Sequence, residues 1–355
     1  MENRYEKFKQ LLDMNGISGH EYKVRKYVKS ELKRYTNEIY EDGLGGVFGV
    51  LGETGPTIMF CGHMDEVGFM VSGITPMGMV KLLAIGGINP EVYLSQNMNV
   101  VLDDGSIIKG IIGAIPPHLA KGEKKPTTME DLVLDIGADS REHAIAMGIK
   151  IGQQVVSDNN FYFTQDQKKI VSKAWDDRFG VGMTLEIMEE VSKMKHNNRV
   201  VFGATVQEEV GCRGGQVSAQ MIKPDLFITI DVSPADDFIR GNEADASLGK
   251  GFLVRYYDPR IIMNRSLHEY FISLCEKYNI KYQEFKSMGG TDAGLAQYAG
   301  NGILATTLGL PGRYIHTTAA MVHTDDMEAV KQMAIAIVKT FDQEMFEKIK
   351  NGFNE

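Results

Sequence analysis

In the second half of the chain, short apolar runs alternate with longer stretches of helical periodicity, and this alternation constrains the fold more than any other feature. The predicted strands are 200–206, 226–230 and 303–308, and the predicted helices are 179–194, 215–221, 267–278 and 327–348. Strands and helices that alternate in this way build a parallel or mixed sheet with helices on both faces. The sequence therefore predicts an α/β protein with a mixed sheet flanked by helices.

The first 66 residues begin the same sheet, and a different pattern interrupts it. Residues 4–36 predict two helices around a Gly/Ser turn, and apolar runs at 47–51 and 57–61 predict two strands. From 67 to 165 the chain changes to short β-prone pieces separated by Gly, Asp-Asp-Gly and Pro-Pro, with one predicted helix behind a Ser140 N-cap. We therefore expect 1–66 and 166–355 to form one discontinuous domain, with 67–165 inserted as a small β-rich domain.

Composition excludes several classes of protein. The net charge of −9, without a run of Lys or Arg, argues against nucleic acid as a partner. Apolar stretches end well before the roughly 18 residues of a membrane span, and the charged amino terminus does not resemble a signal peptide, so we expect a cytoplasmic protein. The 3 cysteines have no metal-binding or disulfide spacing, which leaves histidine and carboxylates as metal ligands.

Side chains capable of chemistry follow the predicted strands, and in open α/β sheets the carboxyl ends of strands face the ligand crevice. The candidates are His63, Asp65, Asp176, Asp177, Glu208, Glu209, Asp231, His316 and His323. Each alone also has an ordinary structural explanation, such as a hydrogen-bonded histidine or acids at a helix start. Together they are histidines and carboxylates without cysteine, a set that suits zinc, cobalt or manganese.

The spacing of these residues indicates roles. His63 and Asp65 share one face of an extended segment, so Asp65 can orient the imidazole. Glu208 and Glu209 point different ways, so one could bind a metal while the other handles a proton. Asp231 ends a buried strand and needs a partner such as a cation. A carboxylate that bridges two ions about 3.5–4 Å apart is a hydrolase arrangement.

The sequence resembles the M42 metallo-aminopeptidases nearly from end to end, from Ser18-Gly19-His20-Glu21 to the last helix. The resemblance is carried by six motifs that occur in the family's order. The motifs are Gly62-His63-Met64-Asp65-Glu66-Val67-Gly68, Ala174-Trp175-Asp176-Asp177-Arg178, Val206-Gln207-Glu208-Glu209-Val210-Gly211, Ile230-Asp231-Val232, Gly289-Gly290-Thr291-Asp292-Ala293-Gly294 and Arg313-Tyr314-Ile315-His316. The resemblance implies an enzyme that removes amino-terminal residues from peptides.

The resemblance also implies a site with two divalent ions, zinc or cobalt in the first place and manganese as an alternative. In that site His63 and Asp231 hold one ion, Glu209 and His316 hold the other, and Asp176 bridges both.

The remaining roles follow from the same resemblance. Glu208 is the implied general base, and Asp65 is the partner that orients His63. His316 is the implied ligand, which leaves His323 a structural or surface residue. The peptide bond between Asp176 and Asp177 is expected to be cis.

At the scale of the molecule, the resemblance implies a zinc-exopeptidase-like catalytic domain and a PDZ-like dimerisation domain at about 67–165. Relatives form dimers that build tetrahedral dodecamers, so we expect a homo-oligomer that admits peptides. A preference for Glu or Asp would need a cation in the specificity pocket, and Arg255 is the candidate; its alternative is an exposed strand arginine in an ion pair. Asp292 is a second candidate substrate contact.

Three alternatives remain open from the residues alone. The nearest is a related co-catalytic metal hydrolase that acts on acylated amino acids or on carboxy-terminal bonds. A two-carboxylate glycosidase is a second, although it would not need His63 and His316. A non-catalytic α/β scaffold is the third; its only support, the Gly-rich segment 42–49, lacks the third glycine of a nucleotide-binding loop.

Overall fold

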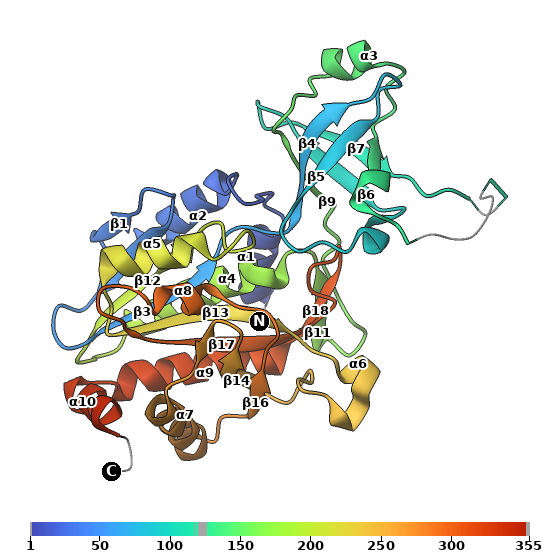
Figure 1. Ribbon diagram of the computed structural model, residues 1–355. Helices are drawn as coiled ribbons and strands as arrows, with labels where there is room; N and C mark the ends of the chain where they lie inside the picture. The colour runs from blue at the N-terminus through green and yellow to red at the C-terminus, as the bar shows by residue number, and fades with distance from the viewer. Residues whose placement is uncertain (1, 117, 120–125, 353–355) are drawn as a thin grey trace.

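The computed structural model describes residues 2–116, 118–119 and 126–352. It contains a large mixed sheet between two layers of helices, and a small barrel projects from one side (Figure 1). The sheet strands run in the order β1-β2-β12-β3-β13-β17-β18-β11-β10, with β14 paired to β17 and with β15 and β16 paired to β14. Their bounds are β1 Ile39–Glu41, β2 Val47–Leu51, β3 Thr57–His63, β10 Tyr162–Phe163, β11 Lys169–Ser172, β12 Arg199–Thr205, β13 Leu226–Pro234, β14 Phe252–Asp258, β15 Ile261–Ile262, β16 Tyr282–Lys286, β17 Leu304–Arg313 and β18 Ala320–His323.

The central strands β12, β3, β13 and β17 are parallel, as the alternating pattern predicts. Every residue of β13 before Pro234 is buried, which is why this strand reads as a continuous apolar run. The pairing places His63 beside Thr205 at the end of β3, and Asp231 beside Gly309 in β13. His63 thus ends β3, whereas Asp231 does not end its strand as expected, because β13 continues to Pro234. Both residues lie toward the carboxyl ends of the parallel strands.

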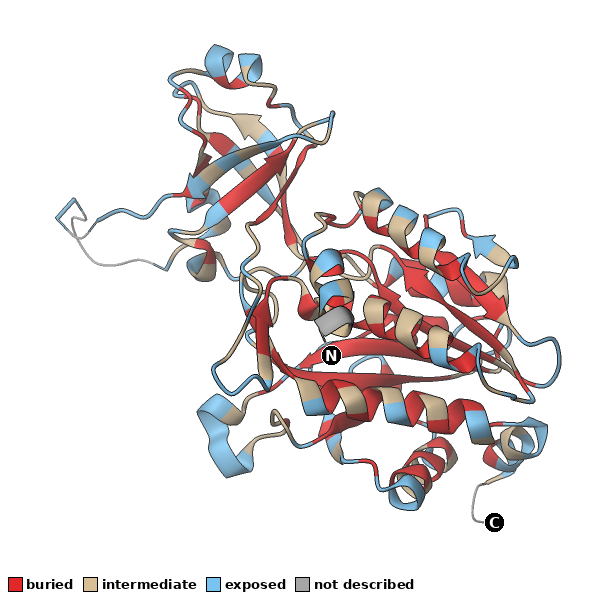
Figure 2. Cartoon of the chain, turned by 180° about the vertical axis from the view of Figure 1, so that it is seen from behind, coloured by how far each residue is buried: buried red, intermediate tan, exposed pale blue. Residues whose placement is uncertain are grey.

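Helices cover both faces of the sheet. Their bounds are α1 Glu2–Leu12, α2 Tyr22–Leu32, α4 Trp175–Val191, α5 Arg213–Ile222, α6 Asp237–Arg240, α7 Arg265–Tyr278, α8 Asp292–Ala296, α9 Thr324–Thr340 and α10 Gln343–Asn351. On one face α4 packs against β3, β12 and β13, together with α1 and α9, and on the other face α5 packs against α8. Figure 2 shows the buried sheet between these layers.

The single helix predicted over 327–348 is wrong. Helix α9 ends at Thr340, and a second helix, α10, begins at Gln343. Asp342 is the N-cap residue of α10, and its side chain accepts a hydrogen bond from the Met345 N–H. An aspartate at this position starts a new helix by satisfying one of its free N–H groups. The two amphipathic helices carry one continuous apolar periodicity, so the pattern hides the break.

The inserted segment folds into a closed antiparallel barrel with its own core. Its strands are β4 Gly68–Ile74, β5 Val80–Ile85, β6 Asn97–Val101, β7 Ile107–Ile112, β8 Val133–Asp135 and β9 Gln154–Ser157, closed in the order β4-β5-β8-β7-β6-β9. The core includes Phe69, Val100 and Leu134 and is separate from the core of the large sheet. The predicted helix is α3, Arg141–Ala146, and Ser140 caps it by accepting the His143 N–H. Strand β8 was not predicted.

None of the helices in the described ranges is both long and apolar enough to cross a membrane.

Candidate metal centre

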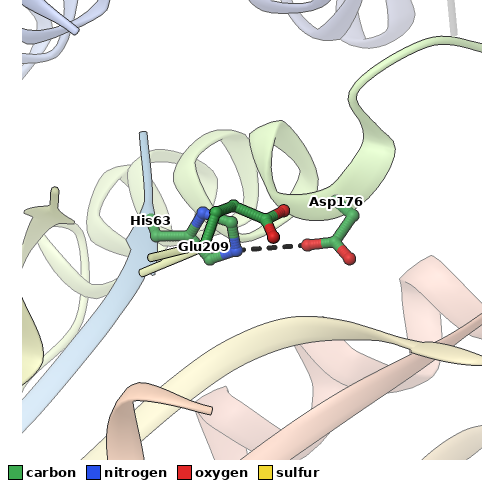
Figure 3. A group of neighbouring side chains, drawn as sticks. All are labelled: His63, Asp176 and Glu209. Atoms are coloured by element: carbon green, nitrogen blue, oxygen red, sulfur yellow. Dashed lines mark hydrogen bonds and ion pairs between the residues drawn. The ribbon is translucent and has the colours of Figure 1, made fainter. Parts of the chain in front are cut away.

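Two segments far apart in the chain bring His63 and Asp176 together. His63 is the last residue of β3, and Asp176 lies at the start of α4. The residue before this helix, Ala174, has a left-handed backbone. The Asp176–Asp177 peptide bond is cis, as expected. His63 Nε2 lies 3.1 Å from Asp176 Oδ1. Both side chains are buried or nearly so, and Figure 3 shows them turned toward each other with Glu209 beside them.

His316 approaches Asp176 from the opposite side. Its Nε2 lies 3.3 Å from Asp176 Oδ2 and 3.5 Å from Glu209 Oε2. Asp176 therefore turns one carboxylate oxygen toward each histidine. This is the arrangement expected if Asp176 bridges two ions, as the resemblance implies.

The other acids lie close to the same point. His63 Nε2 is 3.9 Å from Glu208 Oε2 and 4.0 Å from Asp231 Oδ1. Within the part of the chain that the structure describes, His63, Asp176 and Glu209 form one group that could hold a cation, and His63, Asp177 and Asp231 form another.

His323 does not join this cluster. It ends β18, and its Nδ1 accepts the Asp325 N–H at the start of α9.

Asp65 contacts His63, but its carboxylate mainly holds other groups. His63 Nδ1 lies 3.0 Å from the main-chain oxygen of Asp65 and 3.4 Å from its Oδ1. The Asp65 carboxylate accepts the backbone N–H groups of Glu208 and Glu209 at 3.1 Å each, and the Ser18 hydroxyl at 2.6 Å. Asp65 therefore orients both the imidazole and the acid pair.

The electrostatics of the cluster show an excess of negative charge. Burial raises the pKa of Glu208 well above its usual value. Burial, followed by the negative charge of Asp176, raises the pKa of Glu209 to about 8 and the pKa of Asp231 to about 7. Glu209 Oε1 is buried without a hydrogen-bond partner among the described residues. Carboxylates in such surroundings lack compensating positive charge, which a bound cation would supply.

The two histidines compensate part of this charge. Burial opposes their protonation, but hydrogen bonds with carboxylates outweigh it, so the pKa of His63 lies well above its usual value and that of His316 rises to about 10. Burial would raise the pKa of Asp176, yet its hydrogen bonds with His316 and His63 lower it. In the metal-free site these pKa shifts favour protonated histidines paired with carboxylates.

Sequence reasoning missed a buried ion cluster directly behind the site. Glu66 accepts hydrogen bonds from Lys173 Nζ at about 3 Å, and Arg178 lies 3.5 Å from the same carboxylate. Arg178 also donates to the carbonyls of Leu11, Met14 and Gly16, so it ties the turn after α1 to α4. The signal was present, because Glu66, Lys173 and Arg178 flank the Asp65 and Asp176 motifs.

A cavity of about 460 Å³ opens beside the cluster. It is lined by Asp176, Glu208, Glu209, Asp231, His316, Gly87, Gly211, Cys212, Val232, Pro234, Arg255, Arg260, Ser287, Gly289, Gly290 and Ile315. Asp292 does not line it; this buried carboxylate accepts the Thr205 hydroxyl and the Gly215 N–H behind the wall.

Two arginines lie in this cavity wall. Arg255 is not an exposed strand residue but only 4% exposed, and it donates to Asp258, Ser233 and the Gly289 carbonyl. Arg260 is exposed, and its guanidinium donates to the Cys212 sulfur. Among the described residues, Arg260 has no carboxylate partner for its side chain.

Comparison with known proteins places this arrangement in a family. Residues 45–333 match the model of the M42 glutamyl aminopeptidase family. The chain is 34% identical over 353 residues to the glutamyl aminopeptidase of Lactococcus lactis subsp. cremoris, with 98% of this chain and 99% of the relative covered.

Solved structures agree. A TET aminopeptidase from a marine sediment archaeon, Thaumarchaeota archaeon SCGC AB-539-E09, has a TM-score of 0.94 and 33% identity, covering 98% of this chain and 99% of that one. The TET1 peptidase of Pyrococcus horikoshii, which can assemble into a tetrahedron or a large octahedral shell, has a TM-score of 0.87 and 32% identity over 95% of this chain and 99% of that one.

The fold and the comparisons define a peptidase, a hydrolase of peptide bonds, built on a mixed sheet flanked by helices. The chain belongs to the M42 aminopeptidase family.

Proposed function

We propose that this protein is an aminopeptidase that depends on two divalent ions, zinc or cobalt, with manganese as an alternative. His63 and Asp231 would hold one ion, Glu209 and His316 the other, and Asp176 both. The observation that carries this proposal is the position of Asp176, whose two oxygens lie 3.1 Å and 3.3 Å from the Nε2 atoms of the two histidines.

The donor set fits such ions. Neutral imidazole and carboxylate ligands suit zinc, cobalt and manganese. The buried Glu209 oxygen without a partner and the raised pKa values of Glu209 and Asp231 support a positive charge at this point. The cluster holds more acids than its histidines and nearby cations neutralise.

The chemistry divides between the ions and the chain. When bound, the ions lower the pKa of a water molecule and polarise the scissile carbonyl. Glu208 takes the proton from the attacking water and gives it to the leaving amine. Asp65 holds Glu208 in place through the Glu208 N–H. The carboxylates lining the cavity bind the free α-amino group of the substrate, which limits cleavage to the amino-terminal residue.

The test is a metal reconstitution of Glu208→Gln. The variant should bind two equivalents of cobalt like the wild type, because Glu208 is not a ligand, yet its kcat on aminoacyl-p-nitroanilides should fall about 10²–10⁴-fold. Near-normal turnover of the metal-loaded variant would show that Glu208 is not the base. Activity on amino-blocked peptides would favour an acyl-amino-acid hydrolase instead.

A preference for Glu or Asp is part of the proposal, and the cavity offers two arginines for it. Asp258 compensates the charge of Arg255, whereas Arg260 is exposed, donates to the Cys212 sulfur and has no carboxylate partner among the described residues. Arg260 is therefore the stronger candidate to bind an acidic side chain. Arg260→Leu should lower kcat/KM for Glu-p-nitroanilide at least tenfold more than for Leu-p-nitroanilide.

Arg255→Leu is the comparison variant for this preference. It removes a buried ion pair and should lower kcat/KM for both substrates alike. If Arg255→Leu alone discriminates between the two substrates, the acidic side chain binds at Arg255.

We also propose that the inserted segment, expected at 67–165, forms a separate, PDZ-like domain that joins subunits. The carboxyl-terminal boundary of that expectation is too late, because β10 (Tyr162–Phe163) pairs with β11 in the large sheet. Its own core and its exposed apolar side chains, among them Leu83, Ile107 and Ile151, support this role. A tetrahedral dodecamer, as in the TET1 relative, would have twelve times the 39.4 kDa mass of one chain. A light-scattering mass near one chain would contradict assembly.

A further inference from the structure

We propose that the barrel completes the metal centre, because its loop after β5, residues 86–89, holds His316 in the orientation that a ligand needs. The proposal rests on the two-ion site proposed above. It gives the inserted segment a part in positioning the reaction, in addition to any part in joining subunits.

The first observation is a hydrogen bond between the two halves of the molecule. His316 Nδ1 lies 2.8 Å from the main-chain oxygen of Gly87. A carbonyl oxygen only accepts, so Nδ1 carries a hydrogen, and in the neutral imidazole that a metal ion binds it is Nε2 that has the lone pair. That Nε2 is the atom 3.3 Å from Asp176 and 3.5 Å from Glu209. An acceptor behind a ligating imidazole fixes both its tautomer and its ring orientation.

The second observation is that His316 has little other support. Its loop follows β17 and has left-handed backbones at Tyr314 and His316, with φ 59° at each. The His316 side chain is 36% exposed, against 2% for His63. The ring of His63 is oriented by the carbonyl of Asp65, two residues along its own strand end, whereas His316 obtains the equivalent hydrogen bond from a residue 229 positions away.

The third observation is the closeness of the barrel loop to the site. Gly86 has φ +89°, and a Cβ atom there would lie 2.7 Å from Val67 Cγ1 and 3.2 Å from Glu209 Oε2. A Cβ atom on Gly87 would lie 3.3 Å from His316 Nδ1. The positive φ and the 2.7 Å approach favour glycine at position 86, and a Cβ atom at position 87 would press on the His316 ring.

A further contact joins the segment after β17 to another part of the barrel. The Thr318 hydroxyl lies 3.2 Å from Gln96 Oε1, just before β6 of the barrel. The two parts have separate cores, so these loop contacts, with the chain crossings, link the barrel to the site. Displacement of the barrel would therefore move His316 and weaken the ion that it shares with Glu209.

The test uses apo full-length protein titrated with cobalt(II) and followed by visible absorption, so its readout does not depend on activity. Gly87→Ala crowds the His316 ring, and Gly86→Ala also strains the backbone. Both should weaken the second equivalent of cobalt at least tenfold and leave the first near its wild-type affinity. The matched control is Gly137→Ala, a barrel glycine with φ +75° whose Cβ atom would meet nothing within 4 Å.

The outcomes distinguish a failure of this proposal from a failure of the proposed two-ion function. Binding of both equivalents by Gly87→Ala with wild-type affinity would overturn it, and so would an equal loss in Gly137→Ala. If Gly86→Ala does not fold, Gly87→Ala still decides, because its backbone is not left-handed. A wild-type protein that binds fewer than two equivalents would instead overturn the two-ion function itself.

Discussion

The carboxylate of Asp65 contacts both the ring of His63 and the acid pair Glu208 and Glu209. It accepts N–H groups from Glu208 and Glu209 and touches the ring of His63. In Asp65→Asn an amide NH₂ faces one of those N–H groups, so the acid pair should shift. We expect kcat to fall about 10–100-fold while two ions still bind, as measured by steady-state kinetics on metal-loaded protein.

Ser18→Ala is the control for this variant. It removes a single hydrogen bond to the same carboxylate and should change kcat less than about fivefold. Turnover of Asp65→Asn within twofold of wild type would show that Asp65 does not position the acid pair.

Residue spacing predicted part of this site, but not all of it. The two-residue spacing of His63 and Asp65 correctly indicated that they meet. The main partners of the Asp65 carboxylate lie about 143 positions away, and no local pattern reveals such contacts. Residue spacing also could not decide whether His316 or His323 is the metal ligand. That choice depends on the direction of the loop between β17 and β18.

At the scale of elements, the buried Lys173 joins the end of β11 to the segment that bears Glu66. Both side chains are at most 3% exposed, so removal of the ammonium would leave a buried carboxylate with the Gly16 N–H at 3.1 Å and Arg178 at 3.5 Å as its remaining partners. We expect Lys173→Met to lower the free energy of unfolding by about 3 kcal/mol, measured by urea denaturation.

A surface pair provides the comparison for Lys173. Lys7 pairs with Glu189, where the side chains are 44% and 32% exposed, and Lys7→Met should cost less than about 1 kcal/mol. Adding Glu66→Gln to Lys173→Met should recover part of the lost stability. Equal effects of the two lysine variants would contradict the importance of burial.

Periodicity predicted the long elements well and the short ones poorly. The central strands and α4, α5 and α7 come from strong apolar patterns. Strands such as β8 and β16 are short and partly exposed, and they form only because neighbouring strands pair with them. Their existence is a property of the assembled sheet and has no local signal.

For the whole molecule, the titrating groups of the site predict how metal-free stability depends on pH. The folded-state pKa values of Glu209, Asp231 and His316 are all above the ordinary values, so the folded protein binds more protons than the unfolded chain. Stability should therefore fall as pH rises from about 6 to 9. We expect the Tm of the metal-free protein to decrease over this range in thermal scans.

Bound metal should reverse this trend. The ligands must lose their protons to solvent before they can bind the cation, so metal affinity and the stability it adds increase with pH. The difference in Tm between metal-loaded and metal-free protein should thus widen from pH 6 to pH 9. A constant difference would show that the site does not exchange protons for metal.

The distribution of the proposed ligands along the chain also bears on biosynthesis. They come from the ends of β3, β12 and β13, the start of α4 and the loop after β17. The sheet that unites them depends on pairings between distant segments, which form late because loop closure is costly. A nascent chain on the ribosome that has not yet exposed the β17 loop would lack the last proposed ligand, so the complete two-ion site can form only after that loop has emerged and folded.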